Sequence, residues 1–170
     1  MSKRHVTLRC VAIAAVSLSL GCWLFGRLPS DGLLIDYFGK HRAELDGLVG
    51  MLHEDHAISW ISLTTVEFDD GARSMLDECV RIGPERRESY RRLLRSLHLA
   101  TGVAIRPGEE IILWVSSKGL VTGGSGKGLA YRPDPPERVV ESLDGMESSS
   151  RRGTAYRKID DRWYVFLYWD

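Results

Sequence analysis

Cysteine is scarce in this chain of 170 residues, which contains only Cys10, Cys22 and Cys79. The first two lie in an apolar N-terminal stretch, so Cys79 is the single thiol of the remaining sequence. A domain with one thiol forms no internal disulfide and depends on its hydrophobic core for stability. We expect Cys79 to be buried as a small apolar residue. Pairing between chains and a role as nucleophile are the alternatives.

An excess of basic residues is also missing. The chain has 23 basic and 23 acidic residues. Residues 1–27 contain four of the basic residues and no acid, which leaves 19 basic against 23 acidic residues in the remainder. Nucleic-acid-binding domains concentrate Lys and Arg. The composition therefore predicts a mildly acidic domain with no nucleic acid partner.

Long apolar runs are absent except for one, residues 10–25, with the sequence CVAIAAVSLSLGCWLF. Basic residues precede it, an order typical of a secretory signal. At 1.5 Å per residue the run spans roughly 24 Å, less than the roughly 30 Å hydrocarbon core of a bilayer. We predict a signal peptide or membrane anchor over residues 1–27 and one extracytoplasmic domain over residues 28–170. The predicted location is the bacterial cell envelope, with the domain in the periplasm.

The stretch Leu18–Cys22 resembles a bacterial lipobox, in which a small residue precedes a cysteine that is lipidated and becomes the new N-terminus. Gly21 and Cys22 match that pattern, whereas Ser19 stands where an aliphatic residue is favoured. The resemblance predicts lipidation of Cys22. An uncleaved signal anchor is one alternative, with Trp23 and Arg27 at the outer interface, and a buried core helix of a cytosolic protein is another.

Apolar periodicity predicts two main helices, over residues 31–54 and 84–99. Runs of β-branched and aromatic residues predict strands over residues 58–68, 110–116, 129–132, 154–159 and 162–169. Strand 110–116 is linked to strand 129–132, and strand 154–159 to strand 162–169. Links of this kind favour antiparallel pairing within each of these two pairs. Shorter helices are expected over 72–80 and 135–143. The predicted fold class is α+β, an antiparallel β-sheet packed against two main α-helices, preceded by an N-terminal hydrophobic signal or anchor helix.

The glycine-rich stretch 123–128 lacks the pattern of a nucleotide-binding loop. Val121 stands where a P-loop requires glycine, and Gly128 where it requires Ser or Thr. A predicted strand follows, so no helix N-terminus is available for phosphates. We therefore predict no nucleotide and no cofactor, and expect the glycines to form a hairpin connection with positive φ. The G-x-S-x-G sequence of serine hydrolases is absent too.

Metal-binding residues are few, and the strongest group is His53-Glu54-Asp55-His56. Two imidazoles three residues apart can share a helical face around zinc. A third ligand is missing nearby, since His41 lies twelve residues before His53. We interpret the group as a solvated helix end and predict no metal site and no catalytic residue.

Two further features have a structural and a functional interpretation. Arg91, Arg92 and Arg95 fall opposite the apolar side of the second helix. We interpret them as a solvated face with local ion pairs, with binding to anionic lipids as the alternative.

The last strand, Trp163–Trp169, is apolar on both faces. It is expected to be covered on both sides, and the alternative is that its aromatic residues bind a ligand.

Three stretches together resemble a family of small uncharacterised bacterial exported or lipoprotein-like proteins. They comprise Ser30–Phe38 with His41-Arg42 and Glu54-Asp55, Lys118–Leu120 with Gly126–Gly128 and Tyr131–Leu143, and Tyr156–Tyr164. The resemblance covers most of the chain after residue 27. It implies an envelope location and no catalytic activity.

Two functions follow from these observations. The first is a non-catalytic, membrane-tethered envelope protein that binds an envelope protein partner or another envelope component through its sheet. An immunity-type protein that neutralises an exported toxin is one version of it. The second is a small extracytoplasmic hydrolase or metal-dependent enzyme that uses His53, His56 or Cys79, with the glycine-rich stretch near its site.

Overall fold

A computed structural model describes residues 28–99, 101–106, 108–120, 123–146 and 152–170 of the chain. The predicted signal or anchor helix and Cys22 therefore lie outside the described residues. Within the described part, no helix combines the length and the apolar character needed to cross a bilayer.

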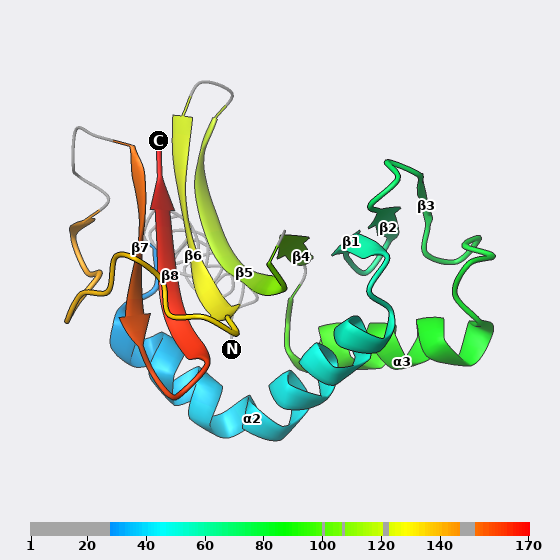
Figure 1. The fold of residues 1–170 in the computed structure, drawn as a ribbon, viewed down its shortest axis with the longest axis horizontal. Coiled ribbons are helices and arrows are strands. Elements are labelled where there is room, and N and C mark those ends of the chain that lie inside the picture. Colours follow the sequence, from blue (N-terminus) through cyan, green and yellow to red (C-terminus); the bar gives the residue numbers. More distant parts are fainter. Residues whose placement is uncertain (1–27, 100, 107, 121–122, 147–151) are drawn as a thin grey trace, which may run out of the picture.

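The described residues form one eight-stranded sheet in which all neighbouring strands are antiparallel. The order across the sheet is β3-β2-β1-β4-β5-β6-β8-β7 (Figure 1). The strands are β1 Ile58–Ile61, β2 Thr65–Phe68, β3 Arg73–Met75, β4 Val103–Arg106, β5 Glu110–Leu120, β6 Gly123–Tyr131, β7 Gly153–Lys158 and β8 Trp163–Trp169.

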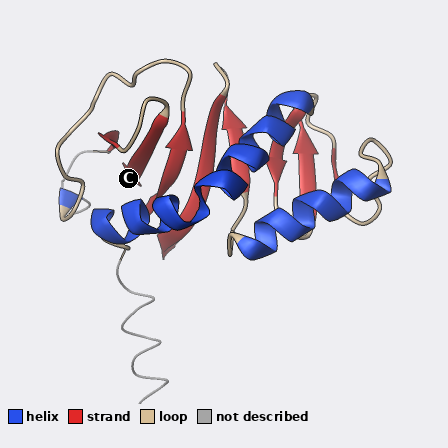
Figure 2. Ribbon diagram, turned by 90° about the horizontal axis from the view of Figure 1, so that it is seen from below, coloured by secondary structure: helices blue, strands red, loops and turns tan. Residues whose placement is uncertain are grey.

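Two helices, α2 Asp31–Glu54 and α3 Pro84–Ser96, cover one face of this sheet (Figure 2). Ser30 caps the start of α2, where its hydroxyl accepts a bond from the Leu33 amide, and the helix kinks at His41. The main core lies between helices and sheet. It includes Leu45 and Leu48 of α2 and Tyr90 and Leu94 of α3, all fully buried. The predicted α+β class with two main helices is therefore confirmed.

The opposite face of the sheet has its own buried cluster. Side chains alternate between faces along a strand, so Ile111 and Leu113 of β5 join the main core while Ile112 points the other way. The second cluster consists of Ile112, Ala130, Tyr156, Tyr164 and Phe166. Strand β8 contributes to both clusters, and most of its residues are buried. The packing interpretation of this apolar strand is confirmed.

The glycine-rich stretch lies inside strand β6 rather than in a turn, which corrects the prediction. A Cβ at position 126 would lie 2.1 Å from Cζ3 of Trp114, and one at position 128 would lie 2.0 Å from the Leu113 carbonyl oxygen. The Trp114 ring in turn meets Phe166 edge-on, with centroids 5.0 Å apart. These glycines are needed because strand β5 and its tryptophan approach the β6 backbone closely, and not for a positive φ.

Residues 58–68 form two strands instead of the predicted single one. The Ser62 side chain accepts bonds from the amides of Thr64 and Thr65, at 3.3 and 3.1 Å. Hydrogen bonds from nearby backbone amides to a Ser hydroxyl stabilise a turn, and here they reverse the chain after Ile61. Strands β1 and β2 are therefore an antiparallel hairpin with Ile61 opposite Val66.

Both predicted short helices are wrong. Residues 73–75 form strand β3 because they pair with β2, with Ser74 opposite Val66. In the segment 135–143, Val139 makes a parallel bridge to Tyr156 of β7. Pairing with a sheet edge satisfies backbone groups that a helix would otherwise bond within itself. Strand β4 was not predicted.

A buried ionic cluster fixes the first residue of α2. Asp31 is fully buried and Lys127 of β6 is 2% exposed. Lys127 Nζ lies 2.8 Å from Asp31 Oδ1 and 2.7 Å from Asp144 Oδ1. Asp31 Oδ2 receives the Leu143 amide at 2.9 Å and Arg157 Nη1 at 3.0 Å. The cluster joins α2, β6, β7 and the segment before β7.

Burial opposes ionisation of Asp31, but the partners prevail. The ion pair with Lys127, the bond from the Leu143 amide and the bond from Arg157 together lower the pKa of Asp31 below its ordinary value. Asp31 Oδ1 accepts no hydrogen bond of good geometry and has the ion pair alone. Loss of Lys127 would therefore leave the buried Asp31 carboxylate with Arg157 as its remaining cation among the described residues, and its Oδ1 atom without an ion pair.

Candidate functional site

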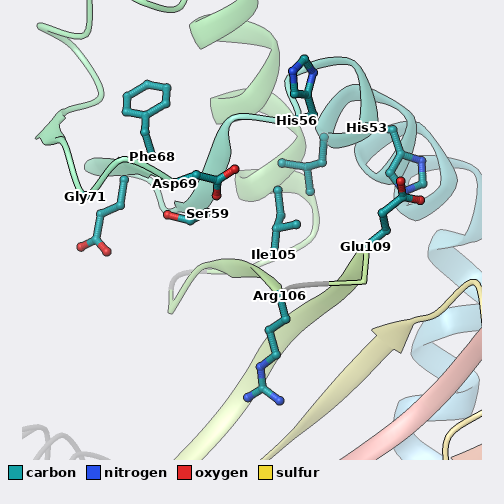
Figure 3. A pocket seen from close by; sticks show the side chains of 11 residues that line it. His53, His56, Ser59, Phe68, Asp69, Gly71, Ile105, Arg106 and Glu109 are labelled. Atoms are coloured by element: carbon teal, nitrogen blue, oxygen red, sulfur yellow. The ribbon is translucent and has the colours of Figure 1, made fainter.

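A cleft of about 930 Å³ opens at the C-terminal end of α2. Its side chains come from that helix end, from β1, from β2 and the turn after it, and from β4 and the β4–β5 turn (Figure 3). The volume falls in the range of about 300–1,000 Å³ that is usual for ligand sites. The lining residues are Leu52, His53, His56, Ser59, Glu67, Phe68, Asp69, Gly71, Ile105, Arg106 and Glu109.

A hydrogen-bond network holds the helix end that carries the two histidines. The carboxylate of Asp55, the C-cap residue, accepts bonds from Tyr90 Oη at 2.6 Å and Arg86 Nε at 2.7 Å. Both donors belong to α3, and Arg86 also donates to the Met51 carbonyl at 2.9 Å. Burial, together with the neighbouring carboxylate, raises the pKa of Tyr90. Helix α3 therefore fixes where α2 ends and where His53 and His56 lie.

A β-bulge places Ser59 at the cleft. Strand β1 pairs with β2 as Ile58 with Phe68 and Trp60 with Glu67, so Ser59 is an extra residue between the two pairs. Bulges redirect one side chain and are frequent beside functional sites. Ser59 lines the cleft, whereas its strand neighbour Ile58 is buried in the core.

The opposite wall is formed by the turn between β4 and β5. Glu109 has a φ of +61°, in the left-handed region that a residue with a Cβ adopts at a cost. Gly108 before it also has a positive φ. This backbone brings Glu109 into the cleft lining with the helix end. A positive φ at a residue with a Cβ persists where the surrounding structure or the function requires it.

The floor of the cleft is apolar and its rim is polar. Leu52 and Phe68 are buried and belong to the main core, and Ile105 packs against that core. His53 packs edge-on against Tyr131, with ring centroids 5.6 Å apart. An apolar floor with a few polar groups is the usual composition of a ligand site.

Four polar side chains of the rim are left without bonds. Within the described part of the chain, the side chains of His56, Ser59, Asp69 and Glu109 make no hydrogen bond or ion pair. Arg106 instead lies 3.8 Å from Glu110 Oε2, and in Figure 3 it extends away from Asp69 and His56. These four side chains line the cleft, where a ligand can reach them.

The cleft residues make few contacts with one another that would serve a chemical reaction. Within the described residues no group of three or more His, Cys, Asp or Glu side chains is arranged to hold a metal ion. Ser59 has no bond to either histidine, so a nucleophile with its base is not assembled there.

The structure places the residues that the second functional hypothesis offered as alternatives in different parts of the molecule. His53 and His56 are exposed, as expected of a solvated helix end, and both line the cleft. Cys79 is a free cysteine buried in the core, as predicted, and lies outside the cleft. The glycine-rich stretch of β6 contributes nothing to the cleft lining either. A site that joins all of these elements is therefore not formed.

The predicted solvated face of α3 also has a local ion pair. Arg91 Nη1 donates to Glu88 Oε2 at 3.3 Å, and Arg91 also pairs with Asp77. Ser59, Asp69 and Glu109 were not identified as site residues from the sequence. A bulge and a left-handed turn residue leave no periodic signal, so the clearest local sign was Gly108 before Glu109.

Comparison of the chain with protein-family models, with curated proteins and with solved structures finds no match. The resemblance to small exported bacterial proteins therefore remains a prediction.

Proposed function

We propose that this chain is a non-catalytic binding protein of the bacterial cell envelope, tethered to a membrane by residues 1–27, which binds a protein partner in the cleft. The observation that carries the proposal is the cleft itself, in which unbonded polar side chains surround an apolar floor. The composition of residues 1–27 supports the tether, since a basic start and a 16-residue apolar run precede the domain.

The tether is tested by the intact mass and the membrane partition of the full-length protein expressed in bacteria. A mature chain that begins at a diacylated Cys22 supports a lipoprotein. A membrane-bound chain of full mass supports an uncleaved anchor. A soluble chain of full mass would overturn the envelope location.

The cleft is tested by photo-crosslinking in the same cells. Replacing Ser59 by the crosslinker p-benzoylphenylalanine should yield a discrete protein adduct, whereas the same replacement at exposed Glu137, outside the cleft, should not. The change Ile105→Trp narrows the cleft from its floor and should suppress the adduct. An adduct of equal yield from both crosslinker positions would contradict binding in the cleft.

A metal-dependent hydrolase is the second candidate, because both imidazoles and the carboxylates of Asp69 and Glu109 line one cleft, although no three such side chains are positioned within the described residues to hold a metal ion. Equilibrium dialysis of the purified protein against zinc, with and without His53→Ala, tests this candidate. Stoichiometric zinc that is lost with His53→Ala would favour the enzyme. Zinc content unchanged by the substitution would leave the binding proposal as the better one.

A further inference from the structure

We infer that the cleft binds a cationic side chain, Lys or Arg, presented by a segment of a protein partner. This inference rests on the proposed binding function and names the chemistry of the partner. It follows from the charges around the cleft, from their internal pairing and from the composition of the floor.

The carboxylates of the cleft outnumber its cations. Glu67, Asp69 and Glu109 line it together with one arginine, Arg106. Asp69 and Glu109 form no ion pair with described residues. Two unpaired carboxylates around one space favour a positive group between them, and the attraction strengthens where the ligand excludes water.

The arginines near the cleft are already engaged with other acids. Arg73 Nε lies 3.0 Å from Glu67 Oε1. Arg81 makes two bonds to Asp70, the residue after Asp69, at 2.6 and 3.2 Å. Arg106 lies 3.8 Å from Glu110. These pairings leave Asp69 and Glu109 without an arginine among the described residues, so both carboxylates are available to a cation of a ligand.

The floor suits the stem of a long basic side chain. Ile105 is partly exposed and offers apolar surface in the cleft, and the edges of the buried Leu52 and Phe68 border it. Lys and Arg bury their methylene stems on such surfaces and keep the charged head among polar groups. Ser59 and His56 add oxygen and nitrogen atoms that can accept bonds from an ammonium or guanidinium group. A small hydrated cation would use the carboxylates but not the floor.

The test uses full-length protein in neutral detergent micelles at physiological salt and a fluorescein-labelled, N-acetylated pentalysine amide, followed by fluorescence anisotropy. Removing both unpaired charges with Asp69→Asn and Glu109→Gln should weaken binding about tenfold. The matched control removes two exposed charges outside the cleft, with Glu137→Gln and Glu141→Gln, and should change binding by less than about twofold.

Four results would overturn the inference. Equal weakening by the control pair would show attraction to net charge alone. Tighter binding of a pentaglutamate peptide would show the opposite polarity. Competition by spermidine as effective as by unlabelled pentalysine would show a site for free polyamines. A Ser59 adduct that persists while pentalysine fails to bind would refute the cationic partner and leave the proposed function standing, whereas loss of the adduct would count against that function itself.

Discussion

The charged side chains near the two ends of helix α2 differ in burial and in pairing. At the N-terminal end, Asp31 and Lys127 are buried and paired. At the C-terminal end, Asp69 and Glu109 line an open cleft and lack partners within the described part of the chain. One helix of 24 residues, about 36 Å long at 1.5 Å per residue, separates the two sites.

The contrast separates charges that hold the fold from charges that are available to a ligand. Removing one partner from a buried pair leaves a desolvated charge, which costs several kcal/mol. Removing an exposed, unpaired charge costs the fold little. Mutations at the N-terminal end should therefore change stability, and mutations at the C-terminal end should change binding.

The largest effect is expected from Lys127→Met. The substitution keeps most of the volume but leaves Asp31 and Asp144 without their shared cation. The free energy of unfolding should fall by about 3–5 kcal/mol, measured by urea denaturation. The control is Lys40→Met on the exposed side of α2, which should change it by less than about 0.5 kcal/mol. Equal losses from both variants would contradict a special role of the buried pair.

The pH dependence of stability should change with Asp31→Asn. Because the folded-state pKa of Asp31 is lowered, its stabilisation is full above the unfolded value of about 3.9 and is lost as pH falls through the folded value. The wild type should be more stable than the variant at neutral pH, by about 3 kcal/mol. The difference should shrink below about pH 4, as followed by urea denaturation across pH. A difference independent of pH would exclude the ion pair as its cause.

A smaller effect is expected where α3 fixes the other end of α2. Tyr90→Phe removes the bond to Asp55 while Arg86 keeps its own. Stability should fall by about 1–2 kcal/mol, measured by thermal denaturation, because the lost bond is to a charged acceptor. Pentalysine binding should weaken as well, since His53 and His56 become less well placed. Unchanged binding would show that the network serves the fold alone.

The smallest effect on stability is expected from Glu109→Gly. Glycine adopts a φ of +61° without steric cost, so the free energy of unfolding should rise by up to about 1 kcal/mol. Binding of pentalysine should fall because a carboxylate is lost. A gain in stability with a loss of binding would show that Glu109 is strained for function, and a loss of stability would contradict this.

Much of the fold was predictable from local patterns. The amphipathic periodicity of residues 31–54 matches α2 because its apolar face needs a sheet to cover it. The antiparallel pairing of β7 with β8 was predicted from the short link at Asp160-Asp161. Strand β3 and the bridge at Val139 were missed because their backbones follow a neighbouring strand rather than their own propensity.

The candidate site was predictable only in part. His53 and His56 were identified as a group, but their role as cleft residues depends on strands more than 45 residues away in the chain, at Ile105 and Arg106. From the sequence, Asp31 was predicted only to begin a helix, and Lys127 only to lie in a glycine-rich hairpin connection. Their burial as a pair could not be predicted, because it requires β6 to pass beneath the first turn of α2.

Side-chain period and composition were enough to predict the two amphipathic helices, the apolar last strand, the buried lone cysteine and the separation of an apolar N-terminal run from a mildly acidic domain. These follow from side-chain period and composition, which act locally. Only the tertiary structure decided which charges are paired and which face a cleft. The reason is physical: an ion pair or a ligand site is made by side chains that meet in space, and such meetings depend on strand register, on a bulge at Ser59 and on a left-handed turn at Glu109.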